Sequence, residues 1–443
     1  MKSSNPSIYE KLTIESADGK KTADISAGAF LVSYYENLFS PIVTAKIVVI
    51  NTGDSIKGED GKMQSLYNGF PLRGGERVVL KISGNSKPNK EGLDFSKDPK
   101  DYFYVASITN VLIDSGKETF TLNLVPREAI TNETTRVGKK FPSSQPISDS
   151  VENILKDYLK SDKINIIDKT QNPYGFIGNL KKPFTILTWL STRGVPLATG
   201  KDASAGYLFY QTKDGFNFRS IDDLIDQEPY KNKFVYTPNI IESDDARNNF
   251  KILTYGTNKN QDLIGKLERG AFCSYRLFFN PLTFEYTNPE KGLFKLSDCQ
   301  KETKNLGRGI ELPPISDDSD LTLGDIPSRY MTAVLDIGTL EKDPYIPKDK
   351  SIADNSDPFK TQSQSIMRYN AIFTQILEMT IPFNAALRAG STIHCEFPRL
   401  DKEERKEPDS EQSGLYIIKE LCHQFNSDGS FTKLKLIKDT FGN

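Results

Sequence analysis

The stretch Leu72-Arg73-Gly74-Gly75-Glu76-Arg77-Val78 has a counterpart near the other end of the chain, Leu387-Arg388-Ala389-Gly390-Ser391-Thr392-Ile393. Each stretch leads through a charged loop to an aromatic strand and then, after a Gly turn, to a third apolar strand. Three pairs of matching residues are separated by 315, 313 and 312 positions: Leu72 and Leu387, Phe103 and Tyr416, Leu122 and Leu434. The nearly constant separation predicts one small β-domain that is used twice in a single chain.

The order strand, loop, strand, Gly turn, strand describes a β-meander, and a meander with an added strand pair can close into a small barrel. The charged loops at 84–91 and 401–408 occupy the same place in both copies, and we expect both to be solvated hairpin tips. The expected fold class is α+β, mainly β, with two similar small antiparallel β-barrel domains. An α+β domain and a Pro/Asp-rich insertion complete it.

The segment between the copies changes character along the chain. Ser148 is placed to cap a helix with apolar residues at helical spacing, and Pro183 is placed to open a second helix. Asp214-Gly215 between two apolar runs predicts a β-hairpin. The expected division is a first barrel at 1–127, an α+β domain at 128–232, a strand-rich segment joining the second barrel at 233–300, a Pro/Asp-rich insertion or arm at 301–360, and a second barrel at 361–443.

Composition narrows the class of protein. The chain has 443 residues with 37% hydrophobic residues, enough to fill several cores. Its 57 basic and 59 acidic residues give a net charge of −2, so the basic excess of a nucleic-acid binder is missing. We expect neither a secretory signal nor a membrane span, because no apolar run approaches the required length.

The four cysteines, Cys273, Cys299, Cys395 and Cys422, form no CxxC pair and are expected to be reduced thiols of a protein made in a cytoplasm. A pairing of Cys395 with Cys422 stays open, because the aligned repeats place both on strands of one barrel.

Catalytic motifs are missing from the sequence. His394 and His423 align with Val79 and Asn110 of the first copy, so neither position demands an imidazole, and structural histidines are expected. The segment 58–63 lacks the spacing of a phosphate-binding loop and is expected to be a turn.

Other candidate sites also have simpler interpretations. The acidic residues Asp317, Asp318, Asp320 and Asp325 lack the alternating spacing of a calcium loop and predict a solvated segment. Arg73 and Arg388, at matching positions, are expected to hold a turn or to face a neighbouring subunit rather than to bind an anion. Trp189 is expected in the core. We therefore predict no catalytic residue, no cofactor, no metal site and no enzymatic activity.

Several segments spread over the chain carry a family resemblance. They are residues 34–41 (YYENLFSP), 71–78 (PLRGGERV), 183–190 (PFTILTWL), 210–218 (YQTKDGFNF) and 414–421 (GLYIIKEL). In this order, and together with the duplicated domain, the chain resembles the baseplate central hub proteins of contractile-tailed bacteriophages, of the T-even-like type found in cyanophages.

The resemblance implies a structural virion protein that forms a homotrimer at the centre of the tail baseplate. Two barrels per subunit would alternate around a pseudo-six-fold ring, which adapts the hexameric tail tube to a trimeric spike. Implied partners are the tail-spike protein, the tail tube or a tube-initiator protein, and the tape-measure and baseplate wedge proteins. DNA would cross the lumen without specific binding, no membrane is involved, and assembly would take place in the bacterial host cytoplasm.

Two alternatives stay open. One is the hub portion of a pyocin or type VI secretion-like spike, disfavoured because such proteins usually continue into a spike β-helix, whereas this sequence ends at Asn443. The other is a baseplate-associated peptidoglycan hydrolase, disfavoured by the shortage of histidine and of catalytic motifs.

Overall fold

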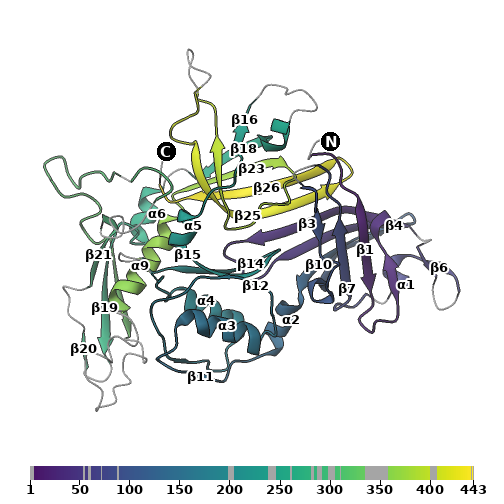
Figure 1. Ribbon diagram of the computed structural model, residues 1–443, viewed down its shortest axis with the longest axis horizontal. Coiled ribbons are helices and arrows are strands. Elements are labelled where there is room, and N and C mark those ends of the chain that lie inside the picture. The colour runs from purple at the N-terminus through teal and green to yellow at the C-terminus, as the bar shows by residue number, and fades with distance from the viewer. Residues whose placement is uncertain are drawn as a thin grey trace.

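The computed structural model describes residues 4–442 apart from 53–54, 58–60, 71, 87–88, 198–203, 238–245, 260–261, 281–283, 287–291, 298–304, 310, 335–357, 400–406 and 441. Within these residues the protein is mainly β, and its long strands form one large sheet (Figure 1). An α+β unit and a smaller sheet pack beside it. The mainly β class expected from the sequence is confirmed.

The first run of strands contains the N-terminal repeat. Its hydrogen-bonded order is β3-β4-β10-β9-β7-β1-β2. The bounds are β1 Tyr9–Glu15, β2 Thr22–Asp24, β3 Ala29–Asn37, β4 Thr44–Thr52, β7 Arg77–Ile82, β9 Phe103–Asp114 and β10 Lys117–Pro126, with the short β8 Leu93–Asp94 on β7. A small excursion holds β5 Ile56–Lys57, β6 Met63–Gln64 and α1 Leu66–Gly69, and two 3-10 turns lie at Ser26–Gly28 and Pro99–Asp101.

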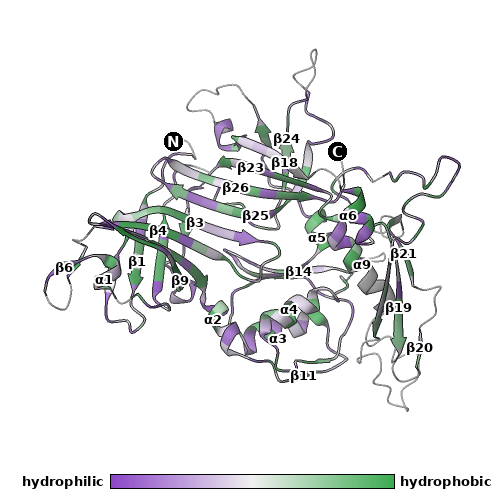
Figure 2. Ribbon diagram, turned by 180° about the vertical axis from the view of Figure 1, so that it is seen from behind, coloured by the Kyte–Doolittle hydropathy of each residue, from purple (hydrophilic) through white to green (hydrophobic). Residues whose placement is uncertain are grey.

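The second run contains the C-terminal repeat and has the order β18-β23-β26-β25-β24-β16-β17. The bounds are β16 Phe234–Tyr236, β17 Lys251–Ile252, β18 Thr254–Lys259, β23 Gln375–Pro382, β24 Thr392–Glu396, β25 Gly414–Asn426 and β26 Gly429–Lys438, with a 3-10 turn at Ala246–Phe250 before β17. Along β26, Leu434 and Leu436 enter the core and alternate with Lys433 and Lys435, as expected for a strand with one solvated face. Figure 2 shows this mixture of hydrophobic and hydrophilic residues along the long strands.

The two runs agree in register as well as in order. Val78 pairs with Phe103 in the first run, and Ile393 pairs with Tyr416 in the second. The matching loop hydrogen bonds also recur: Gly75 N donates to Val105 O, and Gly390 N donates to Ile418 O. In the aligned sequences these residues are counterparts. The duplication read from the sequence is therefore a duplication of hydrogen-bonded structure.

Closed barrels are not observed. Within the described residues, neither run has a ladder that joins its first strand to its last. In each run, however, one continuous stretch supplies both ends: residues 22–37 contain β2 and β3, and residues 251–259 contain β17 and β18. The break lies where these stretches bend between their two partners, so each run is a nearly wrapped sheet rather than a closed barrel.

The α+β unit lies beside the first run (Figure 1). It contains α2 Arg127–Thr134, β11 Lys140–Phe141, α3 Ile147–Asp157, β12 Ile164–Ile167, β13 Phe176–Ile177, α4 Pro183–Ser191, β14 Tyr207–Thr212, β15 Gly215–Ser220 and α5 Ile221–Asp226. Pro183 opens α4 as expected. Ser148 does not cap α3, because the helix begins one residue earlier and Ser148 is buried in its first turn. The hairpin β14-β15 exists, but its two loop residues are Lys213 and Asp214, since Thr212 already pairs with Gly215.

A second, smaller sheet follows the 3-10 turn at Ala246–Phe250 and strand β18. It has β19 Cys273–Asn280 between β20 Glu285–Tyr286 or β21 Leu293–Lys295 on one side and β22 Arg329–Val334 on the other, with α6 Leu263–Glu268 and α9 Pro358–Ala371 nearby. β22 comes from the Pro/Asp-rich segment and pairs with β19 in parallel. Much of that segment, including 335–357, lies outside the described residues. Among the described helices, none is long and apolar enough to span a bilayer.

Candidate functional site

The two strand runs meet along a ladder between β25 of the second run and β3 of the first. Seven antiparallel pairs form it, from Glu420 opposite Asn37 to Asn426 opposite Leu31. Side chains of both runs belong to one hydrophobic core beneath it. We call this ladder, with the groups that pack against it, the seam. The seam makes two copies of one domain into a continuous sheet, and it is the feature with the clearest consequence for assembly.

Aromatic packing fills the core side of the seam. The fully buried His423 ring stacks on Tyr34 of the opposite strand, with centroids 6.1 Å apart, and meets Phe383 edge to face at 5.0 Å. His423 Nδ1 lies 2.9 Å from Thr432 Oγ1. Burial, with smaller contributions from nearby Arg388 and Lys213, holds the pKa of His423 well below its usual range. The ring is therefore a neutral structural group at neutral pH, which agrees with the expected role.

A buried carboxylate ties the seam to the α+β unit. Glu36 accepts hydrogen bonds from Tyr34 Oη at 2.9 Å and from the backbone N–H groups of Lys213 and Ala389, each at 2.8 Å. Burial raises the pKa of Glu36, opposed by the charge of Arg388 and by these donors. One side chain thus connects β3, the β14-β15 turn and the loop before β24, which are far apart in the sequence.

Arg388, in the loop before β24, also connects the β14-β15 turn to the second run of strands. Its Nε and Nη2 atoms donate to the carboxylate of Asp214 at 2.7 and 3.1 Å, and Nη1 donates to the carbonyls of Ala385 and Leu387. The Asp214 pair and the Glu36 charge raise the pKa of Arg388, although burial, the largest single influence, acts in the opposite direction. Arg388 therefore holds a turn, one of the two roles expected for it. Its counterpart Arg73 is exposed.

The structure corrects the interpretation of the loop 84–91. The sequence predicts a solvated hairpin tip, but Asn89 in this loop is 1% exposed and lies in the seam region. Asn89 Nδ2 donates to Phe383 O at 2.5 Å, and its Oδ1 accepts from Ala385 N at 2.7 Å. Asn89 thus completes two backbone groups of the other copy. The matching loop at 401–408 lies largely outside the described residues.

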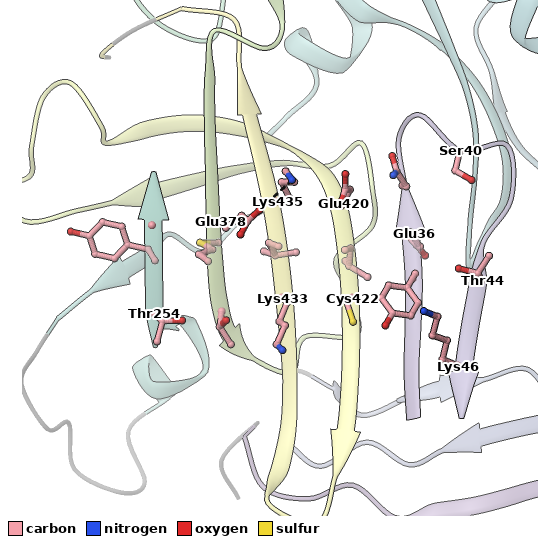
Figure 3. A pocket seen from close by; sticks show the side chains of 18 of the residues that line it. Glu36, Ser40, Thr44, Lys46, Thr254, Glu378, Glu420, Cys422, Lys433 and Lys435 are labelled. Atoms are coloured by element: carbon pink, nitrogen blue, oxygen red, sulfur yellow. Dashed lines mark ion pairs between the residues drawn. The ribbon is translucent and has the colours of Figure 1, made fainter. Parts of the chain in front are cut away.

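The opposite face of the seam is a shallow polar groove of about 680 Å³ that crosses β18, β23, β26, β25, β3 and β4. Figure 3 shows Lys46, Lys433 and Lys435 among Glu378 and Glu420 on these strands. Lys435 and Glu378 form an ion pair at 3.2 Å. Three lysines and two glutamates present accessible side chains to the groove, because the third lining glutamate, Glu36, is 1% exposed and faces the core. Such a surface of mixed charge is hydrated, and its carboxylates weaken its attraction for phosphates.

The remaining sequence candidates lie apart from the seam. His394 is on β24 and is partly buried, which lowers its pKa. Trp189, expected in the core, is half-buried and packs against the core of the α+β unit, and the Arg193 guanidinium lies 4.1 Å from its ring centroid. Asp317, Asp318 and Asp320 are exposed. Asp325 pairs with Lys295 at 3.0 Å and accepts from Thr322 N, and these bonds lower its pKa to about 2.

The cysteines and the turn at 58–63 complete the survey. Cys395 and Cys422 are free thiols, and burial raises the pKa of Cys422 to about 11. Cys273 is buried, and Cys299 lies outside the described residues. Residues 58–60 are not described either. Among the described residues, no three metal-ligating side chains gather in one place.

Glu36, Asn89 and Asp214 were not identified from the sequence. Glu36 stands inside the alternating strand 29–37 at a core-facing position, and a carboxylate there is the one available signal. Asn89 lies in a polar loop, where burial leaves no trace in the sequence. Asp214 is an exposed turn residue, and its distant partner Arg388 cannot be read from the sequence.

Two solved structures share this fold over almost the full length of both chains. A tail protein from Neisseria meningitidis MC58 is 11% identical, with 97% of this chain and 96% of that chain covered and a TM-score of 0.52. The 43 kDa tail protein of prophage MuSo2 from Shewanella oneidensis is 10% identical, with 97% and 98% covered and a TM-score of 0.50. Identities this low establish a common fold and nothing more specific. No family model and no curated protein matches the sequence.

Proposed function

We propose that the chain is a structural protein of a phage-type tail, the ring-forming hub at the centre of the baseplate. The observation that carries the proposal is the seam. It joins two like domains through different edges, β25 of one copy and β3 of the other. A junction between unlike edges is heterologous, so repeating it produces a closed ring or an open filament, never a simple two-fold pair. The fold shared with a tail protein and with a prophage tail protein supports the same conclusion.

Two copies per chain give a ring with twice as many domains as chains. Three subunits would make six similar positions for a hexameric tail tube while keeping three-fold symmetry for a spike. The nearly wrapped strand runs serve as the tube-like domains of this ring. Because the copies differ in sequence, for example Arg77-Val78-Val79 against Thr392-Ile393-His394, the ring can distinguish its two kinds of partner.

In this assembly the polar groove of the seam faces the channel. Its lysines interspersed with glutamates suit a conduit through which DNA passes without being held. The partners are the tail-spike protein, the tail tube or its initiator, and tape-measure and wedge proteins, with segment 301–360 as an arm toward the baseplate. The protein is a virion component in this proposal, and its role is mechanical rather than enzymatic.

The first test is the absolute mass of the purified chain by light scattering over a range of concentrations. The proposal expects a species near three times 49.7 kDa, and a six-lobed ring in negative-stain images. A chain that remains monomeric at every concentration, and also with the spike protein added, contradicts it. A dimer as the largest species contradicts it too.

A further inference from the structure

The counterpart of the seam strand β25 is β9, and the two strands differ in what covers their edges. Both pair with the last strand of the meander on one side and, at their first residues, with the strand before the charged loop. Beyond those first residues, the same edge of β25 is paired with β3. In the described part of the chain, no strand pairs with β9 there, and Leu112 and Ile113 are 68% and 65% exposed.

The counterpart of β3 is β18, and β18 also has an edge without a partner among the described strands. The edges of β9 and β18 therefore correspond to the two edges that meet in the seam. β3 pairs with β4, and β18 pairs with β23, in the same register: Val32 opposite Ile47 corresponds to Tyr255 opposite Met379. The other edge of β3 holds β25, whereas β18 has β23 as its one partner among the described strands. Thr254 and Gly256 are exposed on it.

The correspondence of residues can be followed through the ladders. Thr109 lies opposite Thr121, as Cys422 lies opposite Lys433. A bulge at Asn110 and Val111 then shifts β9 by one residue, and Asn110 has a positive φ of 54°. Beyond the bulge, Leu112 therefore corresponds to Gln424 and Ile113 to Phe425. On the other strand, Ser33 corresponds to Gly256.

We infer that β9 of one subunit pairs with β18 of a second copy of this chain, antiparallel and in the register of the seam. Gln424 opposite Ser33 within the chain then becomes Leu112 opposite Gly256 of the next subunit. Likewise, Phe425 opposite Val32 becomes Ile113 opposite Tyr255. The inference rests on the proposed ring and adds the two edges and the register by which the subunits join.

The intersubunit junction lacks several groups that stabilise the seam. Where the seam stacks His423 on Tyr34, the corresponding residues are Asn110 and Thr257. Smaller side chains bury less apolar surface, so this junction is weaker than the seam. We expect subunit association to depend on concentration, while the two copies within one chain stay joined.

A pair of cysteines tests the register. Directly opposed residues of antiparallel strands have Cα atoms about 4.5–5.5 Å apart, within the range that a disulfide spans. A cysteine at Gly256 meets no atom within 4 Å of its Cβ, and Leu112 is exposed, so neither change disturbs the fold. The variant Leu112→Cys/Gly256→Cys, oxidised with copper-phenanthroline and dioxygen, should give covalent dimers and trimers on a non-reducing gel.

A matched variant is shifted by one residue, Ile113→Cys/Gly256→Cys, whose cysteines point to opposite faces of the sheet and should cross-link no more than the parent chain. Gln424→Cys/Ser33→Cys is the internal control and should form a disulfide within one chain. Efficient cross-linking of the shifted pair, or none from either intersubunit pair although light scattering shows a trimer, overturns the inference and leaves the ring standing. A chain that stays monomeric by light scattering at every concentration, and also with the spike protein added, refutes the ring itself.

Discussion

Strands β25 and β9 occupy the same place in two copies of one domain, yet one is covered along its length and the other is exposed. Every residue of β25 is buried or half-buried. In β9, the residues from Ala106 to Asp114 are exposed except for Ile108. The difference arises from β3, which lies against β25, whereas no described strand of the chain lies along β9 in the same way.

An edge strand that is exposed in the single chain can therefore be covered in the assembly. A long exposed edge normally risks aggregation, and proteins protect it with charges or bulges. β9 has a bulge and a polar turn but keeps the apolar residues Leu112 and Ile113 at its end. In the other copy, the corresponding edge of β25 is paired with β3, so a strand of the β3 type is the partner expected for β9.

The largest expected effect separates Phe425 from its counterpart Ile113. Phe425 is 1% exposed at the seam, so Phe425→Ala should lower the free energy of unfolding by about 3–5 kcal/mol. Ile113→Ala at monomer concentrations should change it by less than about 0.5 kcal/mol. Urea denaturation followed by circular dichroism measures both, and equal losses would show that the two edges are equivalently buried.

Asn89 tests the buried loop of the first copy. Asn89→Ala leaves Ala385 N and Phe383 O without their partners, which should cost about 1–3 kcal/mol. Asn51→Ala, at a half-buried position in the same run, serves as the control and should have a smaller effect. An unchanged urea midpoint in Asn89→Ala would restore the solvated-tip interpretation of the loop.

His423 gives the seam a pH dependence that Asn110 cannot give to β9. Its folded pKa lies well below the unfolded value of about 6.5, so the unfolded state binds a proton that the folded state refuses. Stability from this group is full above pH 6.5 and decreases as the pH falls toward the folded pKa, by up to about 1.4 kcal/mol per pH unit.

The variant His423→Gln isolates this contribution. Relative to the parent chain, its unfolding free energy should lose the His423 slope between pH 6.5 and 5, while the slopes from other groups cancel in the difference. Parallel pH profiles of the two proteins would mean that His423 binds its proton equally well in the folded and unfolded states, which contradicts the lowered pKa.

The smallest effect concerns the paired arginines. Arg388→Ala removes the partly exposed ion pair with Asp214 and two bonds to turn carbonyls, and should cost about 1 kcal/mol. Arg73→Ala at the exposed counterpart should leave folding unchanged within about 0.5 kcal/mol. Thermal unfolding of the two variants side by side measures the contrast, which a comparable loss in both would remove.

Much of the fold could be predicted from local patterns. The strands, the Gly turns, the start of α4 at Pro183 and the internal duplication all follow from residue types at short spacing, since backbone preferences act within a few residues. The prediction that Ser148 caps a helix was wrong, because burial of Ser148 in the first turn outweighed its capping preference. The barrels were expected to close, but the bend in each end-forming stretch leaves its ladder open.

Local patterns along the chain are enough to establish that one β-domain occurs twice and that its strands alternate core and solvent residues, and composition gives the chain a net charge close to zero. Which strand edges meet depends on the tertiary structure. The seam brings Glu36 and Asn89 close to Arg388, which lies hundreds of residues away in the sequence. The free energy that stabilises the seam comes from burial and from hydrogen bonds between distant segments. Such contacts leave no periodic trace along the chain, because they depend on how finished sheets pack and not on the preferences of neighbouring residues.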